Sequence, residues 1–337
     1  MTFTPPSKNR IPSFLKPHPM RQYLTVVILS LLIYSKTHAT TWDEPWAEKV
    51  IKESTSFVLA KVLSSNDEGI RIVIIKTLGG ESLKDTLLIN GFYALRLCST
   101  TGGHGPEFDV APVDSCYFFI RNENNKYRIA TPTTGFDYVE KGRVVATYRH
   151  SYHQASVPVS VYEQSMTAIF NNYHNLAWDK TSINAFIKEY LAKSPAGFEE
   201  TQVETFFLQH VALELVFHLK LTVPEAWLLP FLNDKNNFHN QVSAARAMAA
   251  CNTKEGKQQL LQAIEDTTRR NFVRVICVWS LASMQPEELL NELKRIESTA
   301  SEERDTFGGN IMDPRICTNI PVLKDALAAC VKKLESL

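Results

Sequence analysis

Two similar stretches in the second half of the sequence constrain the fold more than any other feature. The first, LLPFLNDKNNFHNQVSAARAMAAC, runs from Leu228 to Cys251, and the second, LLQAIEDTTRRNFVRVICVWSLAS, runs from Leu260 to Ser283. Matching positions lie about 31 residues apart, a spacing typical of helical-hairpin repeats. Each copy predicts a short apolar helix, an acidic loop and a second apolar helix. Such a unit cannot bury its apolar face alone, so we expect neighbouring units to stack into an α-solenoid.

This part of the sequence resembles the short HEAT-like repeats of phycobilisome-lyase-type proteins, over about residues 200–335. The residues that carry the resemblance are Leu232, Asp234, Val242, Ala244, Ala245 and Ala249 in the first copy, and Ile264, Asp266, Val273, Arg274 and Trp279 in the second. In that family a loop Asp and an Arg early in the second helix commonly pair between neighbouring repeats, and Asp266 and Arg274 match these two positions. In the first copy, Ser243 stands where the Arg would be.

The first half of the sequence has a different period. Phe57–Leu63 and Ile70–Leu78 are β-branched, strand-like runs separated by a turn. Further strand-like runs are Asp85–Ile89, Cys116–Arg121, Lys126–Ile129 and Arg143–Tyr148. Short strands at this spacing indicate a small sandwich or barrel. We therefore predict an α+β chain, with a small antiparallel β-barrel domain at residues 40–155 and a helical-repeat domain at residues 156–337.

Residues 55–135 resemble the oligonucleotide/oligosaccharide-binding (OB) barrel of secreted proteins similar to tissue inhibitors of metalloproteinases. The stretches that carry this resemblance are FVLAKVL, IRIVIIKTLGG, LLI, Cys98 and CYFFIRNENNKYRI. In those inhibitors a mature N-terminal Cys binds the zinc of the target enzyme. Here the first Cys is Cys98, so the resemblance implies an OB-like binding module and argues against protease inhibition.

Residues 1–39 read as an N-terminal extension and signal peptide. Arg21 begins a basic flank, residues 24–33 (LTVVILSLLI) are apolar, and Thr37 and Ala39 place small residues at a cleavage site. The apolar run is about half the ~20 residues that a membrane-spanning helix needs. We expect an exported protein, periplasmic or secreted, with membrane association only if this segment stays uncleaved. Met20 is an alternative start.

The charge distribution bears on the choice of partner. The chain has 36 basic and 36 acidic residues, but residues 1–39 hold five of the basic residues and none of the acidic ones. The remainder is therefore mildly acidic. Sequence-independent nucleic-acid binding needs a basic surface, so we expect no nucleic-acid partner.

The cysteines and histidines offer few candidate sites. Cys98 and Cys116 flank a Gly-rich loop between strands, and we predict a disulfide between them because export permits disulfides. The loop itself, residues 100–106 with His104, lacks the Lys-Ser/Thr of a phosphate-binding loop. His150 and His153, three residues apart on a supposed helix face, could bind a metal with Asp137 or Glu140. A chance spacing explains them better, and we predict no metal and no cofactor.

The sequence contains no recognisable catalytic motif. We therefore expect a non-enzymatic, exported cell-envelope binding or scaffold protein that uses the helical-repeat surface to bind a protein or peptide. One alternative is an exported hydrolase with a dispersed site built from His104, Asp109, His150 and His153. The other is a carbohydrate-binding module on the OB-like face, where exposed Tyr117, Phe119, Tyr127 or Tyr138 would stack on a sugar ring.

Overall fold

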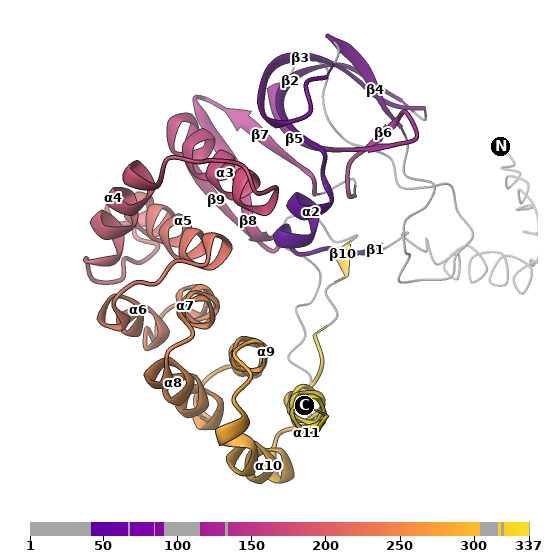
Figure 1. The fold of residues 1–337 in the computed structure, drawn as a ribbon. Coiled ribbons are helices and arrows are strands. Elements are labelled where there is room, and N and C mark those ends of the chain that lie inside the picture. The colour runs from indigo at the N-terminus through magenta and orange to yellow at the C-terminus, as the bar shows by residue number, and fades with distance from the viewer. Residues whose placement is uncertain are drawn as a thin grey trace, which may run out of the picture. The chain divides into compact units, whose positions relative to one another are not determined.

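The computed structural model describes residues 42–66, 68–83, 85–90, 115–131, 134–303, 316–317 and 320–336. Chain contacts divide the protein after Ala39, and Thr40–Leu337 form one compact unit. Most strands come first in this unit and most helices follow, so the fold is α+β in two parts, as the sequence predicts (Figure 1).

Five of the described strands close a barrel. They are β2 (Ser56–Asn66), β3 (Gly69–Gly80), β4 (Thr86–Asn90), β5 (Ser115–Glu123) and β6 (Lys126–Arg128). The strand order is β2-β3-β4-β6-β5, and β2 also pairs with β5, which closes the ring. The β4–β6 pairing is parallel and the other pairings are antiparallel. The predicted barrel is therefore present, and its strands lie where the sequence places them.

Side chains on the barrel strands alternate between two cores, as the two-residue period of a strand requires. On β5, Phe118 and Ile120 point into the barrel interior, whereas Tyr117 and Phe119 join the core that lies under the helices. Phe57 of β2 stacks on Phe119 with ring centroids 4.7 Å apart. Each fully buried ring of this kind contributes about 1.5–3 kcal/mol to stability.

Three further strands extend the sheet from β5. They are β7 (Phe136–Glu140), β8 (Arg143–His150) and β9 (His153–Pro158), in the order β5-β7-β8-β9. The sequence prediction contains β8 without its last two residues and misses β7 and β9. A short helix, α2 (Ala47–Glu53), packs against β8, and α3 (Val159–Tyr173) packs against β3, β8 and β9. The two-residue strand β1 (Trp42–Asp43) pairs in parallel with β10 (Ile316–Cys317).

Glycine permits the close approach of α3 to the barrel. A Cβ atom on Gly79, near the end of β3, would lie 2.5 Å from Cδ1 of Phe170 on α3. No side chain tolerates that contact without a shift of the helix. Gly79 therefore lets Phe170 reach Phe57, and their ring centroids lie 5.9 Å apart.

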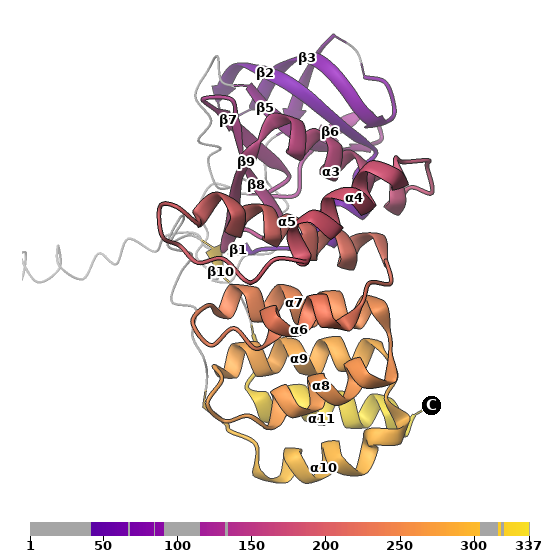
Figure 2. The same cartoon turned by 90° about the vertical axis from the view of Figure 1, so that its left-hand side faces the viewer.

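The helices of the second half pack in pairs. The bounds are α4 (Lys180–Leu191), α5 (Val203–Leu219), α6 (Glu225–Leu232), α7 (Phe238–Cys251), α8 (Lys254–Glu265), α9 (Asn271–Ser283), the 3-10 helix η1 (Glu287–Leu289), α10 (Leu290–Thr299) and α11 (Leu323–Glu335). Each of α5, α7, α9 and α11 packs against the helix that precedes it. Between pairs, α5 packs against α7, α7 against α9, and α9 against α11. Figures 1 and 2 show α6, α8 and α10 on one side of these pairs and α7, α9 and α11 on the other.

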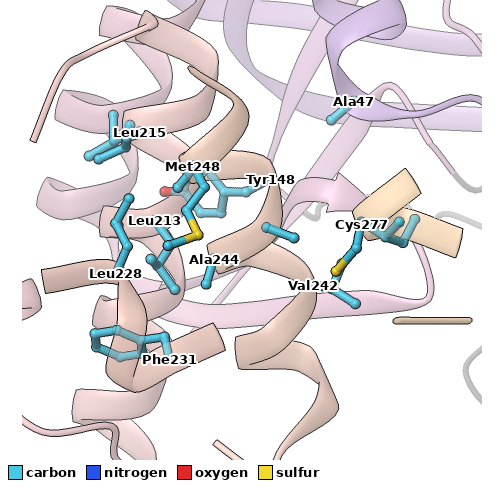
Figure 3. Close-up of a cluster of buried hydrophobic side chains, with 14 of the residues drawn as sticks. Ala47, Tyr148, Leu213, Leu215, Leu228, Phe231, Val242, Ala244, Met248 and Cys277 are labelled. Carbon is cyan, nitrogen blue, oxygen red and sulfur yellow. The ribbon is translucent and has the colours of Figure 1, made fainter. Parts of the chain in front are cut away.

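Buried apolar side chains fill much of the core between these helices. Figure 3 shows its centre, with Leu213 and Leu215 of α5, Leu228 and Phe231 of α6, and Val242, Ala244 and Met248 of α7.

The helices begin at residues that favour a helix start, either capping side chains or prolines. Asp179 caps α4 by accepting a hydrogen bond from the Ser182 amide at 3.1 Å, and Pro224 precedes α6. The two hairpins predicted from the repeat, α6–α7 and α8–α9, are both present.

Asp266 and Arg274, the residues that match the Asp and Arg positions of the HEAT-like repeats, are both described, and no hydrogen bond or ion pair joins them to each other. Asp266 instead pairs with Arg269, at 3.2 Å between Oδ2 and Nε. Arg274 donates from Nε to the carbonyl oxygen of Ile264 at 2.8 Å, near the end of α8. The nearer Arg269 takes the carboxylate because it lies in the same loop.

Two further expectations concern residues that are not all described. Cys98 lies outside the described residues, and Cys116 is buried on β5, so the predicted Cys98–Cys116 bridge remains a prediction. No disulfide joins any two cysteines that the structure describes, and Cys251, Cys277 and Cys330 are buried thiols. Residues 1–39, with the predicted signal peptide, also lie outside the described part. None of the described helices is long and apolar enough to cross a membrane.

Candidate functional site

The predicted His150–His153 pair lies in a β-hairpin and not on a helix. His150 ends β8, His153 begins β9, and the two residues are partners across a turn formed by Ser151 and Tyr152. The helix interpretation is wrong, and burial alternates along β9, where His153, Ala155 and Val157 are buried and the residues between them are half-buried. The hairpin packs against α5, and its turn residue Tyr152 contacts Phe272 of α9.

The two histidines of this hairpin have different surroundings. His150 Nε2 lies 3.2 Å from the carbonyl oxygen of Glu44, and its ring packs between Trp46 and Tyr152. His153 stacks on His239 of α7 at 4.1 Å between ring centroids and lies edge-on to His210 of α5 at 4.2 Å. The sequence gives no sign of this three-histidine cluster, because its members come from three separate elements.

Burial keeps these imidazoles neutral. It lowers the pKa of His150 to about 4 and of His239 to about 3. The pKa values of His153 and His210 are also held well below 6.5, by burial first and by neighbouring cationic or imidazole groups second. Nε2 of His153 and Nε2 of His210 are buried and have no hydrogen-bond partner. The rings are in van der Waals contact, and no set of three metal-ligating side chains in the described residues has an arrangement suited to a metal ion.

A buried arginine lies beside this histidine cluster. Arg149 of β8 is fully buried, and its Nη1 atom donates to the Ser243 hydroxyl at 2.7 Å and to the His239 carbonyl oxygen at 3.2 Å. Ser243 in turn donates to Oε1 of Glu214 at 2.7 Å. The Ser243 hydroxyl is thus held by an arginine and a carboxylate, which leaves it poorly suited to act as a nucleophile.

A second arginine completes the network. Arg246 of α7 contacts Oε2 of Glu214 at 3.3 Å through Nε and binds both carboxylate oxygens of Glu48 through its two terminal nitrogens, at 3.2 and 3.3 Å. Burial opposes the charge of Arg246, but Glu48 and Glu214 outweigh this effect and raise its pKa. The guanidinium also lies 3.8 Å from the centroid of the Phe217 ring.

This junction network, made of Arg149, Glu214, Ser243, Arg246 and Glu48, is balanced in charge. Its two arginines face two carboxylates, and its members come from β8, α5, α7 and α2. Buried ion pairs hold their partners in one geometry, and removal of one partner is expensive. The network therefore fixes the strand-rich half against the helices, and we assign it a structural role.

A second polar network lies under α3. Asp137 of β7 is buried, accepts from the Tyr162 hydroxyl at 2.5 Å and accepts from the Thr147 amide at 3.0 Å. Burial raises the pKa of Asp137 to about 6, against the effect of these hydrogen bonds. A void of about 10 Å³ next to Asp137 could hold a single water. Asp137 is thus committed to Tyr162 and Thr147, which argues against a role as a metal ligand for His150.

An open groove of about 630 Å³ lies between β3 and α3 and ends against the start of α4. Lys76 of β3 spans it to Glu163 of α3, with Nζ and Oε2 2.7 Å apart. Tyr117 donates to the other oxygen of Glu163 at 3.0 Å. Trp178 and Asp179 form the end of the groove. Sequence reasoning missed this site, although polar residues recur at three- and four-residue spacing from Ser160 to Asn171.

The residues of the two alternative functions are only partly described. His104 and Asp109, which the hydrolase hypothesis requires, lie outside the described residues. Tyr117 and Phe119, expected to be exposed for sugar stacking, are buried, because they point toward α3. Tyr127 and Tyr138 are partly buried against the barrel core. The predicted exposure of Tyr117 and Phe119 is therefore wrong, and the sugar-binding alternative remains a hypothesis for Tyr127 and Tyr138.

Comparison of the chain with protein-family models, with curated proteins and with solved structures finds no match.

Proposed function

We propose that this chain is a non-enzymatic, exported cell-envelope protein that binds a protein partner on the face formed by its second helices. The observation that carries this proposal is an exposed tryptophan at the middle of that face. Trp279 of α9 is 36 % exposed and lies edge-on to Trp46, with ring centroids 6.1 Å apart.

The packing of the helix pairs supports a HEAT-like solenoid. The second helices α5, α7, α9 and α11 contact one another in sequence, and each first helix contacts its own second helix. In repeat proteins this arrangement creates an extended face that is wide enough for a partner. We therefore interpret α4–α11 as four HEAT-like units, the last of which ends the row.

The surroundings of Trp279 suit a binding hot spot. Trp46 lies between Trp279 and Arg246, whose guanidinium carbon is 5.2 Å from the Trp46 ring centroid. Tryptophan and arginine are the residue types that most often dominate the energy of protein interfaces. Arg246 is held in place by Glu48 and Glu214, so this part of the face is ordered before a partner arrives. A partner segment with an aliphatic or aromatic side chain would fit against Trp279.

The barrel and the export signal complete the proposal. A five-stranded barrel closed by a β2–β5 pairing, with one parallel pairing, supports assignment to the OB type. Export rests on the basic flank at Arg21, the apolar run of residues 24–33 and the small residues near Ala39. The proposed location is periplasmic or secreted.

Photo-crosslinking tests this proposal. A crosslinking amino acid at Ala282, one turn from Trp279 on α9, should capture one discrete envelope protein. The same variant with Trp279→Ala should lose that product. Ile75→Ala, which removes another exposed apolar side chain on the barrel strand β3 and outside this face, should retain it. Crosslinks that are unchanged by Trp279→Ala would contradict the proposal.

A further inference from the structure

We propose that the groove between β3 and α3 is a second binding site, which takes a neutral oligosaccharide of a few sugar rings. This groove differs from the helical face described above and contains none of its residues. It also differs from the surface of Tyr117 and Phe119 that the sequence favoured for sugar, because those rings are buried. The proposal rests on charge, hydrogen-bonding groups, shape and the irregular edge of β3.

The charged groups that line the groove already have hydrogen-bond partners within the protein. The Glu163 carboxylate accepts from Lys76 and from the Tyr117 hydroxyl, at 2.7 and 3.0 Å. The Asp179 carboxylate accepts from the Ser182 amide at 3.1 Å and from the Ser182 hydroxyl at 2.6 Å. A charged ligand would have to displace one of these partners. A neutral ligand enters at no such cost.

The wall formed by α3 presents hydrogen-bonding groups along one stripe. Ser160, Gln164 and Thr167 follow one another at helical spacing, and Ser160 and Gln164 are exposed. Next along the stripe is Asn171, whose Nδ2 donates to the Ala177 carbonyl oxygen at 2.9 Å. The Asn171 Oδ1 atom is buried and has no hydrogen-bond partner. A ligand with closely spaced hydroxyls can use the exposed donors and acceptors of Ser160 and Gln164.

Trp178 supplies a flat apolar surface at the end of this stripe. Its side chain is partly exposed, and the Lys180 ammonium lies 5.7 Å from its ring centroid. An indole offers a large apolar face with little conformational freedom to lose, which suits the apolar face of a sugar ring. The groove volume of about 630 Å³ falls within the range of small-ligand sites.

The edge of β3 argues against an extended peptide in this groove. Beyond Val73, no described strand pairs with β3 on the side opposite β2. The β2–β3 register, however, shifts around Ile75 and again around Leu78. Such bulges disrupt the regular spacing that a partner strand needs. A ligand without a repeating backbone is therefore favoured over a peptide strand.

Calorimetric titration of the whole chain with maltotriose, cellotriose and triacetylchitotriose tests the proposal. At least one of the three should bind at millimolar or lower concentration. Trp178→Ala and the exposed Gln164→Ala should each weaken that binding by about tenfold, the effect of one lost stacking or hydrogen-bonding contact. Trp279→Ala is the matched control, because it removes an indole from the helical face, and it should leave the sugar affinity unchanged.

Three results would overturn the sugar proposal. One is the absence of binding by all three sugars, and another is binding that Trp178→Ala and Gln164→Ala leave intact. The third is selection, from a random peptide library, of extended peptides that lose binding in Trp178→Ala while no sugar competes. None of these results touches the crosslinking at Ala282, so failure of one proposal is distinguishable from failure of the other.

Discussion

Arg149 donates a hydrogen bond to Ser243 across the junction between β8 and α7, and both side chains are fully buried. Ser243 occupies the place in α7 that Arg274 occupies in α9, about 31 residues further along the chain. Because serine is small, the guanidinium of Arg149 fits where a helix arginine would otherwise lie. The strand-rich half therefore supplies a charged group to the interior of the helical half, and the two halves share one core.

We expect Arg149→Met to destabilise the protein by about 3–5 kcal/mol, because Glu214 would lose one of its two buried cations. Arg143→Met on the same strand is the matched control. Arg143 pairs with Glu204 in a solvent-exposed ion pair, at 3.3 Å, and its loss should cost less than about 1 kcal/mol. Urea unfolding of both variants gives the comparison, and equal losses would refute a role for the junction network in stability.

Stability should fall steadily below pH 6.5. The buried His150 and His239 have folded-state pKa values of about 4 and about 3, against 6.5 when exposed. A group with a lowered folded pKa takes up its proton on unfolding, so its contribution is complete above pH 6.5 and is lost as the pH falls toward the folded value. Each such group adds about 1.4 kcal/mol per pH unit to the loss.

Urea midpoints measured from pH 7.5 to 4.5 check this prediction. Arg149 and Arg246 of the junction network lie beside the histidine cluster, and their charges oppose a new positive charge there. His153→Phe should make the acid loss less steep. A midpoint that is constant or rises between pH 7 and 5 would be incompatible with neutral buried imidazoles.

Asp137 acts in the opposite direction. Its folded-state pKa of about 6 exceeds the ordinary 3.8, so the ionised carboxylate is unfavourable at neutral pH and this cost is relieved as the pH falls from 6 to 3.8. Asp137→Asn should keep stability at pH 7.5 within about 1 kcal/mol of the parent and should steepen the acid loss. Asp137→Val should cost about 1–3 kcal/mol at every pH, because it leaves the Tyr162 hydroxyl and the Thr147 amide without a partner. Equal pH profiles for the Asn variant and the parent would disprove the raised pKa.

The local patterns of the sequence predict most elements, because each depends on neighbouring residues. The strands from Phe57 to Ile129 and the helix pairs from Leu228 to Ser283 are correctly placed. The strand β9 was missed because His153–Pro158 is short and ends in a proline that begins α3. Buried and half-buried residues nevertheless alternate along β9. In the sequence, apolar Ala155 and Val157 alternate with polar Gln154 and Ser156, and this is the signal that could have revealed the strand.

The candidate sites could not be predicted in this way, because their residues meet only in the folded chain. Arg149 and Ser243 are 94 residues apart, and Lys76 and Glu163 are 87 apart. Nothing within a local window marks such partners. The histidines of the His150–Tyr152–His153 turn drew attention for a metal site, whereas their observed neighbours are Trp46, His210 and His239.

The central claim is tested most directly by measuring how tightly the captured envelope partner binds the parent protein and the Trp279→Ala variant. Titration calorimetry should show binding that is weakened by about tenfold or more in Trp279→Ala, in keeping with loss of a tryptophan hot spot. Binding should be unchanged in Ile75→Ala and Trp178→Ala. A partner that binds Trp279→Ala as tightly as the parent would contradict the assignment of the second-helix face as the docking surface.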